Sequence, residues 1–206
     1  MFRIGVLCGV SAPILWASAI ALCGSLRPGY SHLTQYISEL GERGSSTEYL
    51  MRYAGFVPTG LMHVAFAACL LAAFKGSRLG VSGAVLLAIN GLARVGAGMF
   101  PCEPGCSGDE MVTQRLHNLS ATIGFFALIG ATILWGILFR RDRYLRMLSP
   151  YSIGSGILGL AFLVLMNGSA GSRAGPGLYE CLASGVLSLW ILVFALALWR
   201  RGPEAR

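Results

Sequence analysis

The chain has 206 residues, of which 55% are hydrophobic and 12% are charged, whereas roughly 25% of the residues are charged in an ordinary soluble domain. This composition excludes an ordinary soluble protein and predicts an integral membrane protein. The net charge of +7 does not indicate nucleic-acid binding, because the arginines stand in short clusters beside apolar runs and not on a basic face with interleaved aromatic residues.

Six apolar segments are long enough to cross a bilayer. A spanning helix needs about 20 predominantly apolar residues, because the hydrocarbon layer is about 30 Å thick and a helix rises about 1.5 Å per residue. The six segments, in chain order, are 4–26, 50–74, 79–100, 116–139, 150–167 and 178–199. We therefore predict an all-α integral membrane fold in which residues 1–206 form a single domain, a six-transmembrane-helix bundle.

The basic residues between these segments are divided unequally between the two sides of the membrane. One side carries ten: Arg3, Lys75, Arg78, Arg140, Arg141, Arg143, Arg146, Arg200, Arg201 and Arg206. The other side carries five: Arg27, Arg43, Arg52, Arg115 and Arg173. Because cytoplasmic loops are enriched in Lys and Arg, this asymmetry predicts a multi-pass protein of the cell (inner) membrane with cytoplasmic N- and C-termini.

The first apolar segment also fits a second interpretation. Arg3 precedes it, and Ala17-Ser18-Ala19 resembles the small-residue cleavage site of a signal peptide. Cleavage there would leave the topology of the remaining segments unchanged.

The longest outer loop, residues 27–49, has an amphipathic pattern. Leu33, Ile37 and Leu40 recur at helical spacing and define an apolar face. This pattern predicts a short helix in the outer interface that ends at Gly41.

Arg94 is a charged residue inside the third segment, about two turns from its outer end. A charge in that position costs about 2.5 kcal/mol or more and usually faces a partner or a wet cavity. Asn90 lies one turn deeper on the same face. Arg94 therefore either snorkels toward the outer head groups or makes a buried ion pair or ligand contact. The candidate partners are Glu39, Glu103, Asp109 and Glu180.

The histidines divide into those near this outer site and one deeper in the membrane. His117 and Asn118 enter the fourth segment about one turn below the outer surface, and His32 lies in the first outer loop. A histidine near carboxylates can act as a general base or proton relay, because its reference pKa is near 6.5. A structural hydrogen bond explains His117 equally well. For His63, near the bilayer centre, a bridge between two helices is the favoured interpretation.

Cys102 and Cys106 flank Glu103-Pro104-Gly105 in the outer loop that follows the third segment. In an oxidising exterior they can close a small disulfide loop. The alternative is a metal site with a histidine, but two cysteines separated by three residues, with no second pair nearby, are not a strong zinc pattern. We predict the disulfide and no metal, and no sequence signature indicates a cofactor.

Three motifs resemble a known family. They are Ile37-Ser38-Glu39-Leu40-Gly41, Phe100-Pro101-Cys102-Glu103-Pro104-Gly105-Cys106 and Leu116-His117-Asn118-Leu119-Ser120. Together they resemble the bacterial and archaeal membrane family called "domain of unknown function 998", over nearly the whole chain. The first motif, followed by Ser45, Ser46 and Glu48, is also similar to the FRAG/DRAM/SFK membrane proteins. That group has six helices and includes a protein implicated in lipid remodelling of glycosylphosphatidylinositol anchors, so the second resemblance implies a lipid-linked role.

The leading hypothesis is an outward-facing polar pocket for a lipid head group or lipid-linked ligand. The expected ligand-binding residues are Arg94, Asn90, His32, Asn118 and Glu180. If lipid acyl transfer or hydrolysis occurs there, His117 is the acid or base, Glu39 orients Arg94 or His117, and Ser38 completes a hydrolase-like set.

Two alternatives remain open, a non-enzymatic membrane binding or assembly protein and a small-solute transporter with His63 and Arg94 on the path. The expected partner is a membrane lipid and not nucleic acid, and no sequence feature indicates the oligomeric state.

Overall fold

The computed structural model describes residues 2–106, 111–169 and 175–201, and within these ranges the regular structure is entirely helical. The helices are α1 (Phe2–Leu26), η1 (Ile37–Gly41), α2 (Glu48–Leu50), η2 (Met51–Phe56), α3 (Val57–Ala73), α4 (Arg78–Met99), η3 (Pro104–Cys106), α5 (Val112–Phe139), α6 (Leu148–Ser169) and α7 (Pro176–Arg201). Six helical spans among the described residues are long and apolar enough to cross a membrane, with α2, η2 and α3 counted as one span. The predicted all-α, six-helix membrane fold is confirmed, and most of the predicted boundaries lie within four residues of the observed ones.

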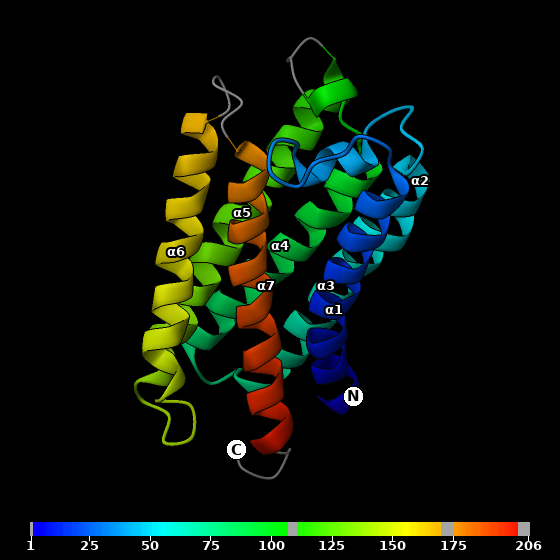
Figure 1. Ribbon diagram of the computed structural model, residues 1–206. Helices are drawn as coiled ribbons and strands as arrows, with labels where there is room; N and C mark the ends of the chain where they lie inside the picture. Colours follow the sequence, from blue (N-terminus) through cyan, green and yellow to red (C-terminus); the bar gives the residue numbers. More distant parts are fainter. Residues whose placement is uncertain (1, 107–110, 170–174, 202–206) are drawn as a thin grey trace.

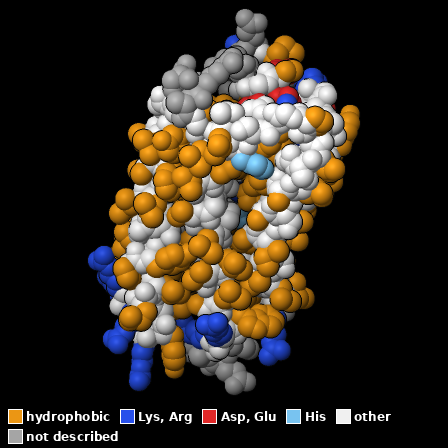
Figure 2. Space-filling view, in the orientation of Figure 1, with side chains coloured by type: hydrophobic (Ala, Val, Ile, Leu, Met, Phe, Trp, Pro, Cys, Tyr) orange, Lys and Arg blue, Asp and Glu red, His pale blue; other side chains and the backbone are white. Residues whose placement is uncertain are grey.

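The two ends of the bundle differ in their loops and in their charge. Phe2 and Arg201 lie at the end where Figure 1 marks N and C, which we call the terminal end. The opposite end carries η1 and η3, and we call it the loop end. Figure 2 shows most of the visible Lys and Arg side chains toward the terminal end, the visible Asp and Glu side chains near the loop end, and apolar side chains between them. This distribution agrees with the predicted orientation, but the cytoplasmic location of the termini stays a prediction.

The half of the bundle near the terminal end has a dense aromatic core. The ring centroids of Trp135 on α5 and Phe194 on α7 are 4.8 Å apart, and Phe74 contacts Trp135 at the same centroid distance. These side chains bury large apolar areas and hold α5 and α7 against the turn that follows α3.

Small residues let neighbouring helices approach closely. A Cβ atom on Gly60 of α3 would lie 2.6 Å from the carbonyl oxygen of Gly91 on α4, so this crossing requires glycine. Gly136 of α5 packs in the same way on Ile153 of α6. Close approach of this kind replaces the hydrophobic driving force that lipid removes between membrane helices.

Beyond this contact, α5 and α6 diverge toward the loop end, as Figure 1 shows. Their outer halves do not close on one another, and side chains from both line a shared cavity. This divergence creates the space for the site described below.

The first loop folds back onto the bundle. Its helix η1 is a short 3-10 helix that ends at Gly41, as predicted, but it begins at Ile37 and does not include Leu33. Ile37 and Leu40 are 1% and 0% exposed and belong to a core cluster with Trp16, whereas Leu33 is 58% exposed. The apolar face of η1 therefore packs against the helix ends, and a location in the membrane interface stays a prediction.

Candidate functional site

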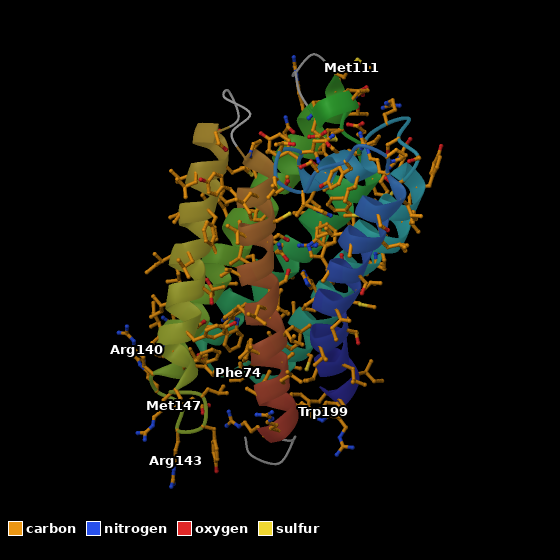
Figure 3. The ribbon with its side chains drawn as sticks, in the orientation of Figure 1. Phe74, Met111, Arg140, Arg143, Met147 and Trp199 are labelled. Atoms are coloured by element: carbon orange, nitrogen blue, oxygen red, sulfur yellow. A yellow bond between two sulfur atoms is a disulfide. The ribbon has the colours of Figure 1, made fainter. Side chains whose placement is uncertain are left out.

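A cavity of about 630 Å³ lies in the loop-end half of the bundle, between α1, α4, α5, α6, α7 and η1. Six of the eight residues predicted for the site line it: Ser38, Asn90, Arg94, His117, Asn118 and Glu180. Residues from all three motifs of the sequence thus meet around one space. Figure 3 shows the side chains that fill the bundle, with Met111 at the loop end and Arg140, Arg143 and Met147 at the terminal end.

Arg94 enters this cavity from α4 without a carboxylate bonded to it. Its guanidinium carbon lies 4.1 Å from the ring centroid of Trp16 on α1, a cation–π contact. Its Nη1 atom is buried and has no hydrogen-bond partner in the described part of the chain. A buried, unsatisfied donor on a charged group is costly in a protein interior.

The predicted carboxylate partners of Arg94 are engaged elsewhere or stand apart from it. The ion pairs among the described residues are Arg27–Glu42, Arg43–Glu103, Arg52–Glu48 and Arg201–Asp142. Glu103 is therefore bound to another arginine, and Asp109 lies outside the described residues. Glu180 lies near enough to act on Arg94 electrostatically, but it does not form an ion pair with it.

Glu180 lies in the first turns of α7, and its carboxylate is held from one side. Its Oε2 atom accepts a hydrogen bond of 2.7 Å from the backbone N–H of Ile37, at the start of η1. Glu180 thus joins α7 to the first loop, and it also lines the cavity.

Tyr36 is another residue of the first loop that lines the cavity. Burial raises the pKa of its phenol, and the charges of Glu180 and Glu39 raise this pKa further, so the hydroxyl stays protonated.

His117 is held in a defined orientation at the end of α4. Its Nδ1 atom lies 2.8 Å from the carbonyl oxygen of Phe100 and 3.1 Å from that of Ala97. Because a carbonyl oxygen only accepts, Nδ1 must carry the hydrogen, so in the neutral ring Nε2 is the acceptor. The side chain is 4% exposed and lines the cavity, which makes Nε2 a candidate base.

Asn90, which lines the cavity, connects three helices. Its Oδ1 atom lies 2.8 Å from His63 Nδ1 on α3, and its Nδ2 donates a 2.9 Å hydrogen bond to the carbonyl oxygen of Gly124 on α5. His63 is therefore a bridging residue between helices, in agreement with the interpretation that the sequence favours.

The structure does not join Ser38, Glu39 and His117 in a hydrogen-bonded set. The Glu39 carboxylate accepts from Tyr36 N and from Gln35 Nε2, both at 2.9 Å, and so stabilises the start of η1. Both carboxylate oxygens are thus bonded within its own loop, and the expected role of Glu39 in orienting Arg94 or His117 stays a prediction. Ser38 does line the cavity, and its catalytic role stays a prediction.

His32, the remaining predicted ligand, lies outside the lining of this cavity. Its ring packs edge-on against Tyr30 at a centroid distance of 4.9 Å, and the residue is exposed. Its position in the first loop places it beside α1 and not among the residues that surround Arg94.

Arg52, which the sequence pattern places among the outer-loop charges, is a buried residue of the site region. Arg52 is 7% exposed and lies in η2, a π-helical turn of the kind that often occurs at functional sites. Its Nη1 is 2.5 Å from Glu48 Oε1, and its Nε donates a 2.8 Å hydrogen bond to the carbonyl oxygen of Gly98. Arg52 thus caps the end of α4, where a positive charge complements the helix dipole. The spacing of four residues from Glu48 is the signal that could have revealed this pair.

Trp16 and Ser184 were also missed. Trp16 donates from Nε1 to Ser184 Oγ at 2.8 Å and supports Arg94 with its ring, and both residues line the cavity. A lone tryptophan in the outer half of an apolar segment was the available signal.

A disulfide joins Cys102 and Cys106, whose Cα atoms are 5.0 Å apart, and Cys106 lines the cavity. The loop that it closes is tied to the first loop, because the N–H of Gly105 donates to Glu42 Oε2 at 2.6 Å. Gly105 has a φ of +73°, which favours glycine. Residues 102–106 and the first loop therefore form one cover over the cavity.

The described residues contain no group of three or more His, Cys, Asp or Glu side chains that could hold a metal ion. The polar lining of the cavity consists of one arginine, one carboxylate, one histidine and several neutral hydrogen-bonding groups.

Comparison with known proteins gives one match. No curated protein and no solved structure matches the chain, so the likeness to the FRAG/DRAM/SFK proteins stays a prediction. The family described as "Protein of unknown function (DUF998)" matches residues 10–197, a range that includes the three motifs and every residue of the cavity, and the chain belongs to this family.

Proposed function

We propose that the protein binds a membrane phospholipid by its head group, with the phosphate at Arg94. The observation that carries the proposal is that Arg94 lines a cavity of about 630 Å³ while its buried Nη1 has no hydrogen-bond partner among the described residues. A phosphate oxygen would satisfy this donor, and guanidinium groups bind phosphate through two parallel hydrogen bonds.

The depth of the site suits a head group. Arg94 precedes the end of α4 at Met99 by five residues, and Glu180 follows the start of α7 at Pro176 by four. At about 1.5 Å per residue, both lie roughly 6–8 Å inside the helix ends. In a membrane whose surface meets these helix ends, this is the level at which the polar groups of a lipid meet its acyl chains.

The cavity also reaches the lipid-facing surface. Phe126 of α5 and Val164 of α6 line it, although they are 56% and 64% exposed on the outside of the bundle. The divergence of α5 and α6 thus leaves a lateral opening through which a lipid can enter from the bilayer.

The test compares lipids with and without phosphate on three forms of the protein in detergent. A phospholipid should raise the melting temperature of the wild type by roughly 5 °C at about 100 times its Kd, and a diacylglycerol with the same acyl chains should not. Arg94→Gln should lose this increment. Arg43→Gln removes an exposed arginine at the same end of the bundle, outside the cavity, and should keep it. An equal lipid response in wild type and Arg94→Gln would overturn the proposal.

Hydrolysis of the bound lipid is a second candidate, favoured by the orientation of His117. Its Nε2 can accept a proton from water while the water oxygen adds to an ester carbonyl, and the same proton can pass to the departing alcohol. His117→Asn tests this step, because an asparagine amide can still donate to the carbonyl of Phe100 but offers no base. Loss of fatty-acid release with an unchanged melting temperature would support catalysis. A wild type that releases no fatty acid from any bound phospholipid would exclude it.

A further inference from the structure

The cavity is lined by two oppositely charged residues that do not form an ion pair with each other. Arg94 enters from α4 and Glu180 from α7, and both line the same space at similar depth. Neither belongs to an ion pair among the described residues. Each is instead held by a different neighbour, Arg94 by the Trp16 ring and Glu180 by the N–H of Ile37.

Both residues line the cavity, and each has an atom without a hydrogen-bond partner among the described residues. Nη1 of Arg94 is an unsatisfied donor. Glu180 uses Oε2 for the bond to Ile37, and its other carboxylate oxygen has no hydrogen-bond donor among the described residues. The two residues thus provide one hydrogen-bond donor and one acceptor in the lining of the same cavity.

These opposite charges determine which ligand is favourable. An anion alone would be attracted by Arg94 but repelled by Glu180. A cation alone would be attracted by Glu180 but repelled by Arg94. In a region of low dielectric constant both penalties are larger than in water. A ligand that carries a phosphate and a cation separated by only a few bonds would compensate both charges together.

We infer that the ligand is a phospholipid whose phosphodiester bears a primary ammonium group, with the phosphate at Arg94 and the ammonium at Glu180. This inference rests on the function proposed above and specifies its head group. A primary ammonium supplies N–H donors that the free oxygen of Glu180 can accept. A quaternary ammonium has no N–H and is usually recognised by an aromatic cage, but the Trp16 ring is already covered by Arg94.

The apolar wall of the cavity provides the place for the rest of the molecule. Phe125 of α5 and Leu160 and Leu163 of α6 continue the lining from the charged end toward the opening between these helices. A head group bound at Arg94 and Glu180 can therefore leave its acyl chains in this opening and in the bilayer beyond. The same continuous cavity serves both parts of the lipid.

The experiment measures head-group selectivity with phosphatidylethanolamine, phosphatidylglycerol and phosphatidylcholine of identical acyl chains. Binding is followed by native mass spectrometry and by melting temperature in detergent. The wild type should bind phosphatidylethanolamine about fivefold or more tightly than the other two, because only this lipid makes charge-assisted hydrogen bonds at both sites. This comparison within the wild type does not depend on the folding of any variant.

Glu180→Gln should reduce the preference over phosphatidylglycerol to less than about twofold while phosphate-dependent binding persists. Glu103→Gln, which changes a carboxylate at the same end but outside the cavity, should keep the preference. Equal binding of phosphatidylethanolamine and phosphatidylglycerol by the wild type, or a preference that Glu180→Gln does not change, would overturn the inference and leave the phosphate site intact. Phosphatidylcholine bound as tightly as phosphatidylethanolamine would overturn the assignment of a primary ammonium. A wild type that binds none of the three would overturn the proposed function as well.

Discussion

His63 and Asn90 are joined by a 2.8 Å contact between Nδ1 and Oδ1 in the interior of the bundle, and the Asn90 amide continues to the carbonyl of Gly124. The contact connects α3 to α4, and the second hydrogen bond connects α4 to α5. His63 is 2% exposed and Asn90 is 4% exposed, so neither side chain has bulk water as an alternative partner. This relationship distinguishes a structural role for His63 from a role on a transport path.

If the pair is structural, His63→Phe and Asn90→Leu should each lower stability, and a double-mutant cycle should give a coupling energy of about 1 kcal/mol, the usual size for hydrogen bonds between membrane helices. The measurement is thermal or denaturant unfolding of the wild type, both single variants and the double variant in one detergent. Solute flux in liposomes that His63→Phe abolishes without lowering stability would instead support the transporter hypothesis.

The disulfide between Cys102 and Cys106 predicts a specific alkylation pattern. Unfolded protein prepared without reductant should take up four alkyl groups, at Cys8, Cys23, Cys69 and Cys181, and six after reduction. Intact mass measures both numbers, and six adducts without reduction would show that the bond is absent. Replacement of both bridged cysteines by serine should cost about 2 kcal/mol of stability, as expected for closing a loop of about five residues.

The orientation in the membrane can be tested at two exposed methionines at opposite ends of the bundle, Met111 and Met147, which Figure 3 labels. In a background without the four free cysteines, Met147→Cys should react with a membrane-impermeant maleimide only after the cells are opened. Met111→Cys should react in intact cells, because the more basic end of a membrane protein faces the cytoplasm. The opposite pattern of labelling would reverse the predicted topology.

Asp142 predicts a pH dependence at the terminal end. Burial alone would raise its pKa, but hydrogen bonds from the N–H groups of Tyr144 and Leu145 and from the guanidinium of Arg201 outweigh this effect and lower it. A lowered pKa means that the stabilising contribution is present at neutral pH and is lost as the pH falls below the ordinary value of 3.8. For this partly exposed pair the contribution should not exceed about 1 kcal/mol.

The measurement compares melting temperatures of wild type and Asp142→Asn between pH 7 and pH 3. Asparagine keeps an acceptor for the two N–H groups but loses the charge and the oxygen that accepts from Arg201. The difference between the proteins should therefore be constant down to about pH 5 and shrink below pH 4. A difference that does not change with pH would mean that the charge of Asp142 contributes nothing.

The amino-acid sequence by itself determined the class of the protein and its span pattern. Whether a segment can cross a membrane depends on its own length and apolar content, and both are local properties. For the same reason the sequence identified Arg94 as unusual, since a charge within an apolar segment is costly whatever its neighbours are. The disulfide could also be anticipated, because its two cysteines are only four positions apart.

Only the tertiary structure decided which polar groups meet. It set Arg94 against Trp16 and in the same cavity lining as Glu180. It also directed the Glu39 carboxylate to its own loop and bonded Arg52 to the end of α4. These relationships depend on how each helix is rotated and tilted against its neighbours. In a membrane, rotation and tilt are set by close contacts such as that between Gly60 and Gly91 and by the divergence of α5 from α6. Such contacts involve residues distant in the chain, and because lipid is as apolar as the helix surface, hydrophobicity does not indicate which face of a helix is buried.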